Sequence, residues 1–367
     1  MKNAMLVLQV CAVLWFPCQG CAAGRHVPQL DHVFLIMMEN HDYDEPGRVP
    51  AILNNDADAP YINAMAKKYD LATNYLAVGH PSLTNYLEVV GGSNFGVNRD
   101  LSPHWGSPEN TKHRYGFIPA HGTDIASSSF AYAKACCDDQ LGYTVPGGAP
   151  FVGETIADQL ERAGKTWKSY QESLPIRGGY GVDTSDGDKI NQGAHLYVAK
   201  HNPFEYFRST QGSKAIVGYA SDPQRRAIGG ALARDLAAGT VADFNFIAPN
   251  LCHDMHGAPL CSQAHALIRD GDEEVQALVT AITGSAVWKT GRNAIIVMWD
   301  ENDFSATGNN RIPVIVMTSY QSKGMHSDRA YNHFSLLKTL EQGFGLHYLN
   351  HARDPDIHAM TDIFAPR

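Results

Sequence analysis

The stretch that decides the fold lies near the N-terminus and reads His32-Val33-Phe34-Leu35-Ile36-Met37-Met38-Glu39-Asn40-His41-Asp42-Tyr43. Its apolar run from Val33 to Met38 is typical of a strand that is buried on both faces. The run stops at polar side chains, from Glu39 to Asp42, that can hold a metal ion or a proton. Ligand sites of open α/β sheets lie just beyond the carboxyl ends of such strands. The stretch therefore predicts either the floor of an active site or, if Asn40 or Asp42 caps a following helix, an ordinary helix start.

Other apolar runs repeat this pattern and alternate with segments of helical spacing. The run from Asn293 to Trp299 also ends at carboxylates, those of Asp300 and Glu301. Further strands are expected at 73–78, 165–172, 243–248 and 312–317, and helices at 60–69, 153–163, 273–287 and 333–344. Strands that alternate with helices form a mainly parallel sheet covered by helices on both faces. We therefore expect an α/β fold in which several polar clusters meet at one edge of one sheet.

The composition is that of a globular chain. Of the 367 residues, 44% are hydrophobic and 18% are charged, which argues against an intrinsically disordered protein. The net charge of −9 argues against a general nucleic-acid binder, because phosphate contacts require a basic surface. We expect a single catalytic domain over 24–367, with an irregular insertion rich in Gly, Pro and Ser at about 93–150.

The first 23 residues have the pattern of a secretion signal. Lys2 supplies a positive charge, the apolar segment from Ala4 to Phe16 is too short to span a bilayer, and small residues up to Ala23 offer a cleavage site. No later stretch has the ~20 apolar residues of a membrane helix. We therefore expect 1–23 to be a signal peptide and the mature protein to be periplasmic or secreted. Lipidation of Cys21 stays an open alternative.

Four cysteines remain after the expected signal peptide: Cys136, Cys137, Cys252 and Cys261. An even number in an exported protein favours disulfides, and four cysteines allow three pairings. Cys252 and Cys261 flank a short loop and are the most natural pair. The pairing of the adjacent Cys136 and Cys137 stays open.

The residues that could carry chemistry fall into five groups: Glu39 with Asn40, Ser82 with Asn85, His253 with Asp254 and His256, Asp300 with Glu301, and His333. Carboxylates buried at strand ends are costly unless they bind a cation. The oxygen ligands of the two strand-end groups favour Ca²⁺, Mg²⁺ or Mn²⁺ over Zn²⁺. The histidines could hold a second metal, or act as acids and phosphate contacts.

Ser82 lies in an expected turn between Pro81 and Asn85. A serine hydroxyl is a poor nucleophile until a metal lowers its pKa. The side-chain amide of Asn85 could donate a hydrogen bond to a developing anionic oxygen. Each of these signals is weak by itself, and their joint occurrence favours an active site.

Together these motifs resemble the phosphoesterase family, which contains secreted acid phosphatases, including the phosphatidylinositol 3-phosphate phosphatase type, and bacterial phospholipases C. The segments that carry the resemblance are Met38-Glu39-Asn40-His41, Gly79-His80-Pro81-Ser82-Leu83-Thr84-Asn85-Tyr86, Pro249-Asn250 with Asp254-Met255-His256, Trp299-Asp300-Glu301 and Tyr331-Asn332-His333-Phe334-Ser335. The resemblance runs from about Val33 to Leu349 and implies the alkaline phosphatase-like fold, a three-layer sandwich.

The resemblance also implies a role for each matching residue. Ser82 is the expected nucleophile, Asn85 a phosphate contact, and His256 or His333 the acid that protonates the leaving group. The expected metal ligands are Glu39, Asn40, Asp254, Asp300 and Glu301. Two positions depart from the family pattern: Thr84, where relatives often have Pro, is a rival nucleophile, and the role of His253 is open.

We therefore expect an exported, metal-dependent acid phosphatase that hydrolyses phosphate monoesters through a phosphoserine. Its cofactor would be a divalent ion, Ca²⁺, Mg²⁺, Mn²⁺ or Zn²⁺. Its partner would be a small phosphorylated substrate, such as a phosphoinositide or a phospholipid head group, and neither nucleic acid nor a transmembrane segment is expected. A phospholipase C acting on phosphodiesters is the alternative, and a non-catalytic secreted binding protein is a remote one.

Overall fold

The stretch from His32 to Met38 forms the central strand of a nine-stranded sheet. This count applies to the residues that the computed structural model describes, which are 26–45, 49–95, 100, 153–174, 196–222, 227–303, 309–321 and 324–365. The expected signal peptide, Cys136, Cys137 and nearly all of the expected insertion lie outside these residues. No helix in the described part of the chain is long and apolar enough to cross a membrane.

The strands of the sheet are β1 (His32–Met38), β2 (Asp70–Ala72), β3 (Trp167–Glu172), β4 (Ile216–Ser221), β5 (Ile228–Gly229), β6 (Phe244–Ala248), β7 (Asn293–Trp299), β8 (Val314–Thr318) and β9 (His326–Ser327). Their spatial order is β5-β4-β3-β6-β1-β7-β8-β2-β9. The pairs around β1, β3 and β6 are parallel, whereas β7–β8, β2–β8 and β4–β5 are antiparallel. The sheet is thus mixed and mostly parallel, which confirms the predicted α/β class.

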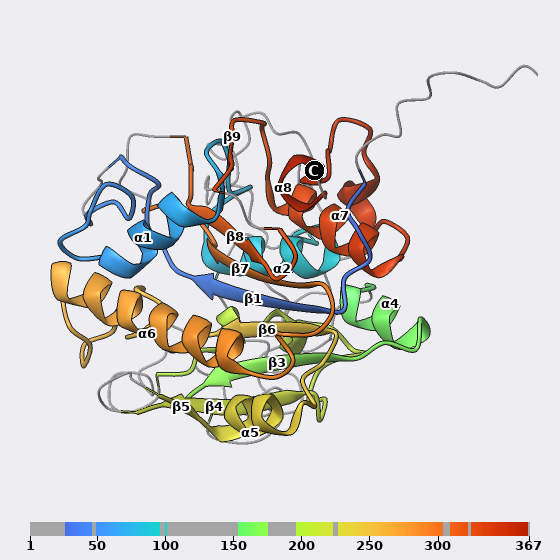
Figure 1. Ribbon diagram of the computed structural model, residues 1–367, viewed down its shortest axis with the longest axis horizontal. Coiled ribbons are helices and arrows are strands. Elements are labelled where there is room, and N and C mark those ends of the chain that lie inside the picture. Colours follow the sequence, from blue (N-terminus) through green and yellow to red (C-terminus); the bar gives the residue numbers. More distant parts are fainter. Residues whose placement is uncertain are drawn as a thin grey trace, which may run out of the picture.

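The α-helices are α1 (Pro60–Lys68), α2 (Ser82–Gly91), α4 (Ile156–Arg162), α5 (Gly230–Ala238), α6 (His265–Gly284), α7 (His333–Phe344) and α8 (Thr361–Phe364), and the 3₁₀ turns are η4 (Ala199–His201), η5 (Pro203–Tyr206) and η6 (Asn350–Arg353). The long helix α6 packs with α1 and α5, while α2 packs with α4 and α7. These two groups cover opposite faces of the sheet (Figure 1). The strand residues of β1 and β7 are therefore buried on both faces, as their continuous apolar runs predict.

Three expectations about local structure were wrong. The strand expected at 73–78 is replaced by β2, which ends at Ala72, followed by single bridges from Tyr75 and Leu76 to loop residues. Partners in loops cannot supply the continuous ladder that a strand needs. The turn expected at Ser82 is instead the first turn of helix α2. Helix α6 also begins earlier than expected, because its first turns already bury Leu267 and Ile268.

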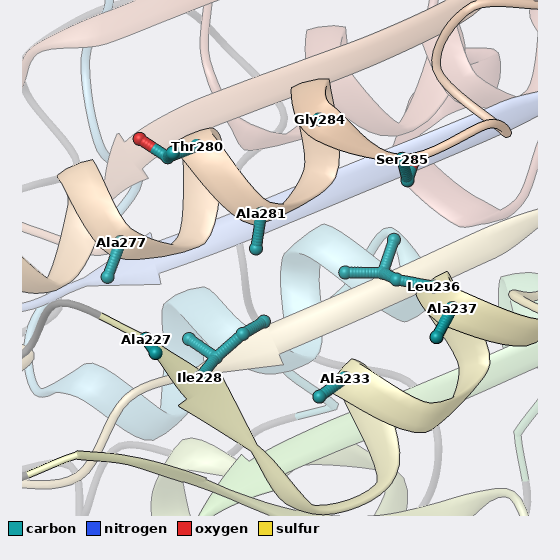
Figure 2. A pocket seen from close by; sticks show the side chains of 10 residues that line it. All are labelled: Ala227, Ile228, Ala233, Leu236, Ala237, Ala277, Thr280, Ala281, Gly284 and Ser285. Atoms are coloured by element: carbon teal, nitrogen blue, oxygen red, sulfur yellow. The ribbon is translucent and has the colours of Figure 1, made fainter.

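A cavity of about 360 Å³ lies between α5 and α6 (Figure 2). Its walls are small or apolar side chains such as Ala233, Leu236 and Ala281, with hydroxyl groups from Thr280 and Ser285. None of the side chains that line it carries a charge or an imidazole. The cavity therefore lacks a charged side chain or an imidazole that could activate its hydroxyl groups, and the titratable side chains gather at the strand ends instead.

Candidate active site

Glu39 and Asp300 lie together at the carboxyl ends of two neighbouring strands. Strands β1 and β7 pair in parallel up to Met38 and Trp299, so the next residue of each strand lies at the same edge of the sheet. Both carboxyl groups are fully buried. Burial raises the pKa of each well above its ordinary value, and the charge of Asp300 raises the pKa of Glu39 further. Such a pair is stable in its charged form only if positive charge lies close by.

Asn40 adds an amide oxygen to this pair. Its φ of 52° lies in the left-handed region, which Asn tolerates better than most residues. The side-chain oxygen faces Glu39 Oε2 and Glu301 Oε1, at 3.2 and 3.3 Å. Oxygens bound to a hard cation are typically about 3 Å apart, so this arrangement suits a divalent ion. With the amide turned over, its nitrogen would donate to both carboxylates, which is the arrangement expected without a cation.

Ser82 is the first residue of α2 and contacts the carboxylate pair directly. Its hydroxyl donates to Glu39 Oε2 over 2.9 Å, and one turn later the Tyr86 hydroxyl donates to Glu39 Oε1 over 2.6 Å. The Thr84 hydroxyl, in contrast, donates to the carbonyl of Pro81 at 2.8 Å. The positive end of a helix favours an anion. An anionic group bound at this helix start would therefore meet the Ser82 hydroxyl first.

Asn85 holds the segment before α2 against Glu301. Its amide nitrogen donates to the carbonyl of Gly79 at 2.9 Å and to Glu301 Oε2 at 2.8 Å, while its oxygen accepts from the Gly79 N–H. His80 Nδ1 lies 3.0 Å from the other oxygen of Glu301. Both amide hydrogens of Asn85 are thus engaged. A direct contact between Asn85 and a bound anion would require one of these bonds to be exchanged.

His201 connects Glu39 to Asp254. Its Nε2 lies 3.1 Å from Glu39 Oε1, its Nδ1 lies 3.0 Å from Asp254 Oδ2, and its ring stacks on that of Tyr86. A carboxylate behind a histidine is the usual arrangement for a histidine that binds a metal. Glu39, His201 and His256 offer donor atoms within 4.8 Å of one another, a second position that could hold a cation. Asp254 orients His201 here, and its expected role as a direct ligand stays a prediction.

Lys200 brings a buried positive charge to His256. The Lys200 side chain is only 1% exposed, and its Nζ lies 3.1 Å from His256 Nε2 and 2.9 Å from Asp100 Oδ2. His256 Nδ1 lies 2.9 Å from the carbonyl of Gly257. Because a carbonyl can only accept, Nδ1 carries a hydrogen and Nε2 accepts from Lys200. The ammonium and the imidazole together form a group that can bind an anionic oxygen and pass on a proton.

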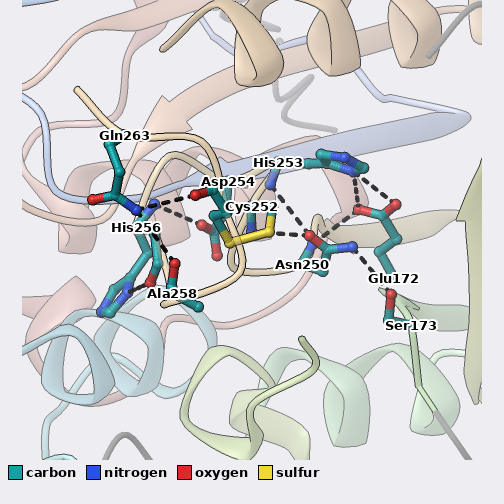
Figure 3. Close-up of a disulfide and its surroundings, with 11 residues drawn as sticks. Glu172, Ser173, Asn250, Cys252, His253, Asp254, His256, Ala258 and Gln263 are labelled. Atoms are coloured by element: carbon teal, nitrogen blue, oxygen red, sulfur yellow. Dashed lines mark hydrogen bonds and ion pairs between the residues drawn. A yellow bond between two sulfur atoms is a disulfide. The ribbon is translucent and has the colours of Figure 1, made fainter. Parts of the chain in front are cut away.

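The predicted disulfide between Cys252 and Cys261 is present and is confirmed. It closes the loop that carries His253, Asp254 and His256 (Figure 3). Within the loop, Asp254 Oδ1 accepts a hydrogen bond of 2.7 Å from the backbone N–H of His256. The disulfide therefore limits the movement of Asp254, which contacts His201, and of His256, which contacts Lys200.

His333 is fully buried next to Asp300. Its Nε2 lies 2.7 Å from the carbonyl of Asp300, and its Nδ1 lies 3.2 Å from the hydroxyl of Tyr75. Burial lowers the pKa of His333 to about 4. The ring is therefore neutral near pH 7, with its hydrogen on Nε2 and both nitrogens engaged. In this state it positions the Asp300 backbone, and proton transfer by His333 stays a prediction.

Sequence reasoning missed three residues of the site: Tyr86, Lys200 and His201. Tyr86 could have been found if the segment after Pro81 had been recognised as a helix, because residues four apart share a face. Lys200 and His201 lie in a 3₁₀ turn with no local signal that distinguishes them from surface residues. Only the fold brings these two side chains to the strand ends.

Comparisons with known proteins identify the family of the chain. The Phosphoesterase family matches residues 53–347. The phosphatidylinositol-3-phosphatase of Mycobacterium tuberculosis is 25% identical over 351 residues, which are 95% of this chain and 87% of that protein. An acid phosphatase of Aspergillus fumigatus is 24% identical over 319 residues, and the match covers 85% of this chain and 54% of that protein. The chain thus spans about half the length of this fungal relative.

Solved structures show the same fold. A protein in the alkaline phosphatase superfamily from Vibrio parahaemolyticus aligns with a TM-score of 0.50 at 14% identity, over 94% of this chain and 72% of that one. A protein from the glycosaminoglycan metabolism of Bacteroides thetaiotaomicron aligns with a TM-score of 0.53 at 10% identity, over 92% and 82%. These matches confirm the predicted alkaline phosphatase-like fold. Since the family match covers most of the chain, the chain belongs to the Phosphoesterase family.

Proposed function

We propose that the chain is an exported, metal-dependent acid phosphatase that hydrolyses phosphate monoesters through a phosphoserine intermediate. The observation that carries this proposal is the Ser82 hydroxyl, which begins helix α2 and donates to Glu39 within a group of buried carboxylates. The acid phosphatase and phosphatidylinositol-3-phosphatase relatives support a monoester as substrate. The disulfide between Cys252 and Cys261 supports export, because such bonds persist in oxidising compartments.

The residues that would hold the cation are those whose oxygens converge at the strand ends, Glu39, Asn40, Asp300 and Glu301. When bound, the cation would lower the pKa of the serine hydroxyl and stabilise negative charge on a phosphate oxygen. Ligands that are all oxygen suit Mg²⁺, Mn²⁺ or Ca²⁺. His201 would add an imidazole at the second position, and His256 would add another only if its Nε2 left Lys200; imidazole ligands also suit Zn²⁺.

The chain's own residues would bind the substrate and manage the protons. The start of α2 and the Lys200 ammonium attract the phosphoryl oxygens. Ser82 Oγ forms a bond to phosphorus as the ester P–O bond breaks in line, and Glu39 Oε2 is the acceptor within reach of the serine proton. The Lys200–His256 pair protonates the leaving oxygen. Water then attacks the phosphoserine, which releases phosphate and restores the hydroxyl.

The test compares phosphate release by the wild type, Ser82→Ala and Thr84→Ala. We expect Ser82→Ala to fall below about a hundredth of the wild-type rate while keeping its fold and metal content, because the bond-forming group is gone. Thr84→Ala is the matched control and should keep most of the activity, since its hydroxyl bonds to the Pro81 carbonyl. The reverse result would assign the nucleophile to Thr84.

Three further measurements make this test specific. Acid quenching during turnover, followed by peptide mass spectrometry, should find phosphate on Ser82 and not on Thr84. Comparing p-nitrophenyl phosphate with p-nitrophenylphosphorylcholine separates a monoesterase from a phosphodiesterase. A screen of phosphoinositides, nucleotides and sugar phosphates then identifies the substrate class. Faster hydrolysis of the choline diester would replace the proposal with a phospholipase C-type activity.

A further inference from the structure

A second group of ligand-type side chains lies next to the disulfide loop. Figure 3 shows His253 pointing away from His256 and toward Glu172, the last residue of β3. Glu274, from helix α6, completes the group. Three elements far apart in the sequence thus bring one imidazole and two carboxylates together. None of the three side chains takes part in the catalytic steps proposed above.

The distances within this group suit a small metal ion. His253 Nδ1 lies 2.8 and 2.9 Å from the two oxygens of Glu172, and 3.8 Å from Glu274 Oε2. One donor atom from each residue lies within 4.8 Å of the others. In a tetrahedral zinc shell with bonds of about 2.0–2.2 Å, neighbouring ligand atoms are roughly 3.3 Å apart. The separations of His253 Nδ1 from the two carboxylates, 2.8 and 3.8 Å, lie on either side of this value.

Because these carboxylates are buried, their negative charge is energetically unfavourable unless a cation lies nearby. Glu274 is fully buried and Glu172 is 3% exposed. Neutral groups donate to them: the Tyr219 hydroxyl to Glu274 Oε1 at 3.1 Å, and the backbone N–H of Asn250 to Glu172 Oε2 at 2.9 Å. Such donors fix the carboxylates in place but do not balance two negative charges. The His253 imidazole faces both carboxylates, and a divalent ion would add the positive charge that neutralises them.

The three elements are held together at fixed distances. A side chain at Gly271 of α6 would lie 2.5 Å from Met255 Cγ, so the missing Cβ is what lets the helix pack against the disulfide loop. Glu274 follows three residues later and is thereby directed at His253. The loop itself is closed by the disulfide that flanks these residues. Binding a metal here would therefore require little rearrangement.

We propose that Glu172, His253 and Glu274 form a zinc site distinct from the active site. One imidazole and two carboxylates suit Zn²⁺ better than Ca²⁺ or Mg²⁺, and water would take the fourth position. The bound zinc would tie β3 and α6 to the loop that carries Asp254 and His256. It would act on the active site only by holding that loop in place.

The test measures zinc per chain by plasma mass spectrometry after chelation and reloading with zinc alone. We expect His253→Asn and Glu274→Gln each to bind about one zinc fewer per chain than the wild type. Zinc should also raise the melting temperature of the wild type by more than that of either variant. His265→Asn is the matched control, because its exposed ring lies at the start of the same helix, pairs with Asp58 and should not affect zinc content.

Circular dichroism and the mass of the unreduced protein check that each variant is folded with its disulfide. If one variant fails to fold, the zinc content of the other variant decides the test. Anomalous scattering at the zinc absorption edge, measured on crystals of the wild type, tests the site without any variant. A peak between Glu172, His253 and Glu274 supports the proposal. Unchanged zinc content in both folded variants, the same loss in His265→Asn, or zinc found solely beside Glu39 would overturn it.

Discussion

The hydrogen bond from Tyr86 to Glu39 allows a sharp test of how the site holds a cation. The Tyr86 hydroxyl donates to Glu39 Oε1 over 2.6 Å, both side chains are fully buried, and the Tyr86 ring stacks on His201. Tyr86→Phe removes the hydroxyl and keeps the ring, so the packing against His201 is preserved. The change therefore isolates one donor to the charged form of Glu39.

The expected magnitude follows from the charge of the acceptor. A hydrogen bond to a charged group contributes about 1.5–3 kcal/mol, which corresponds to a factor of about 10 to 100 in an equilibrium constant. Because the hydroxyl favours the ionised carboxylate, its removal should raise the already elevated pKa of Glu39. Protons then compete better with the cation. We expect Tyr86→Phe to weaken cation affinity by about 10- to 100-fold, and more at acidic than at neutral pH.

The assay is a titration of the metal-free protein with Mg²⁺, Mn²⁺, Ca²⁺ or Zn²⁺, followed by calorimetry and by phosphate release. At saturating cation the turnover number should stay within a few-fold of the wild type, since Ser82 is untouched. Tyr170→Phe is the matched control, because the Tyr170 hydroxyl donates to Asp235 over 2.7 Å on α5. It should lower stability without changing cation affinity. Equal cation affinities in the wild type and Tyr86→Phe, or equal losses in both variants, would refute the reasoning.

Other contacts support three more predictions. Asp300→Asn removes a full negative charge from the expected ligands of the cation, so a chelator should inactivate this variant faster than the wild type. If both proteins retain the metal equally, Asp300 is an ordinary strand-end carboxylate and not a metal ligand. The disulfide between Cys252 and Cys261 closes a short loop, and the chain-entropy model gives a stabilisation of about 2.5 to 3 kcal/mol for it. We expect mild reduction to lower activity before the circular dichroism signal changes; if both are lost together, the bond has only a general stabilising role. Burial raises the pKa of Glu341, which accepts from the Leu349 N–H, from 4.5 to about 9. The pKa of Glu341 is higher in the folded than in the unfolded state, so its protonation stabilises the fold fully below pH 4.5, and this stabilisation is lost as the pH rises toward 9. The free energy of unfolding should therefore fall by up to about 1.4 kcal/mol per pH unit in this range. Urea unfolding of Glu341→Gln should show a smaller pH dependence, and an unchanged pH dependence would contradict the assignment.

The amino-acid sequence alone was enough to predict the sheet and the acidic part of the site. The runs Val33–Met38 and Ala294–Trp299 are apolar throughout, and their short length favours strands buried on both faces. Since parallel strands end at the same edge, Glu39 and Asp300 were expected at one edge of the sheet, and the strand order then made them neighbours. The short separation of Cys252 and Cys261 likewise pointed to their pairing. These predictions succeeded because each depends on local pattern and on one general rule of sheet geometry.

The partners of those carboxylates were decided by the tertiary structure. His201 lies 162 positions after Glu39 in the sequence, and no periodicity or spacing links the two. The contact arises because the 3₁₀ turn at Ala199–His201 packs against α2. The same holds for His333, whose sequence context predicted an acid but whose ring is engaged by Asp300 and Tyr75. Sequence patterns indicate which side chains lie at a strand end. The direction in which each side chain points depends on packing between elements that are distant in the sequence, and no local pattern encodes that packing.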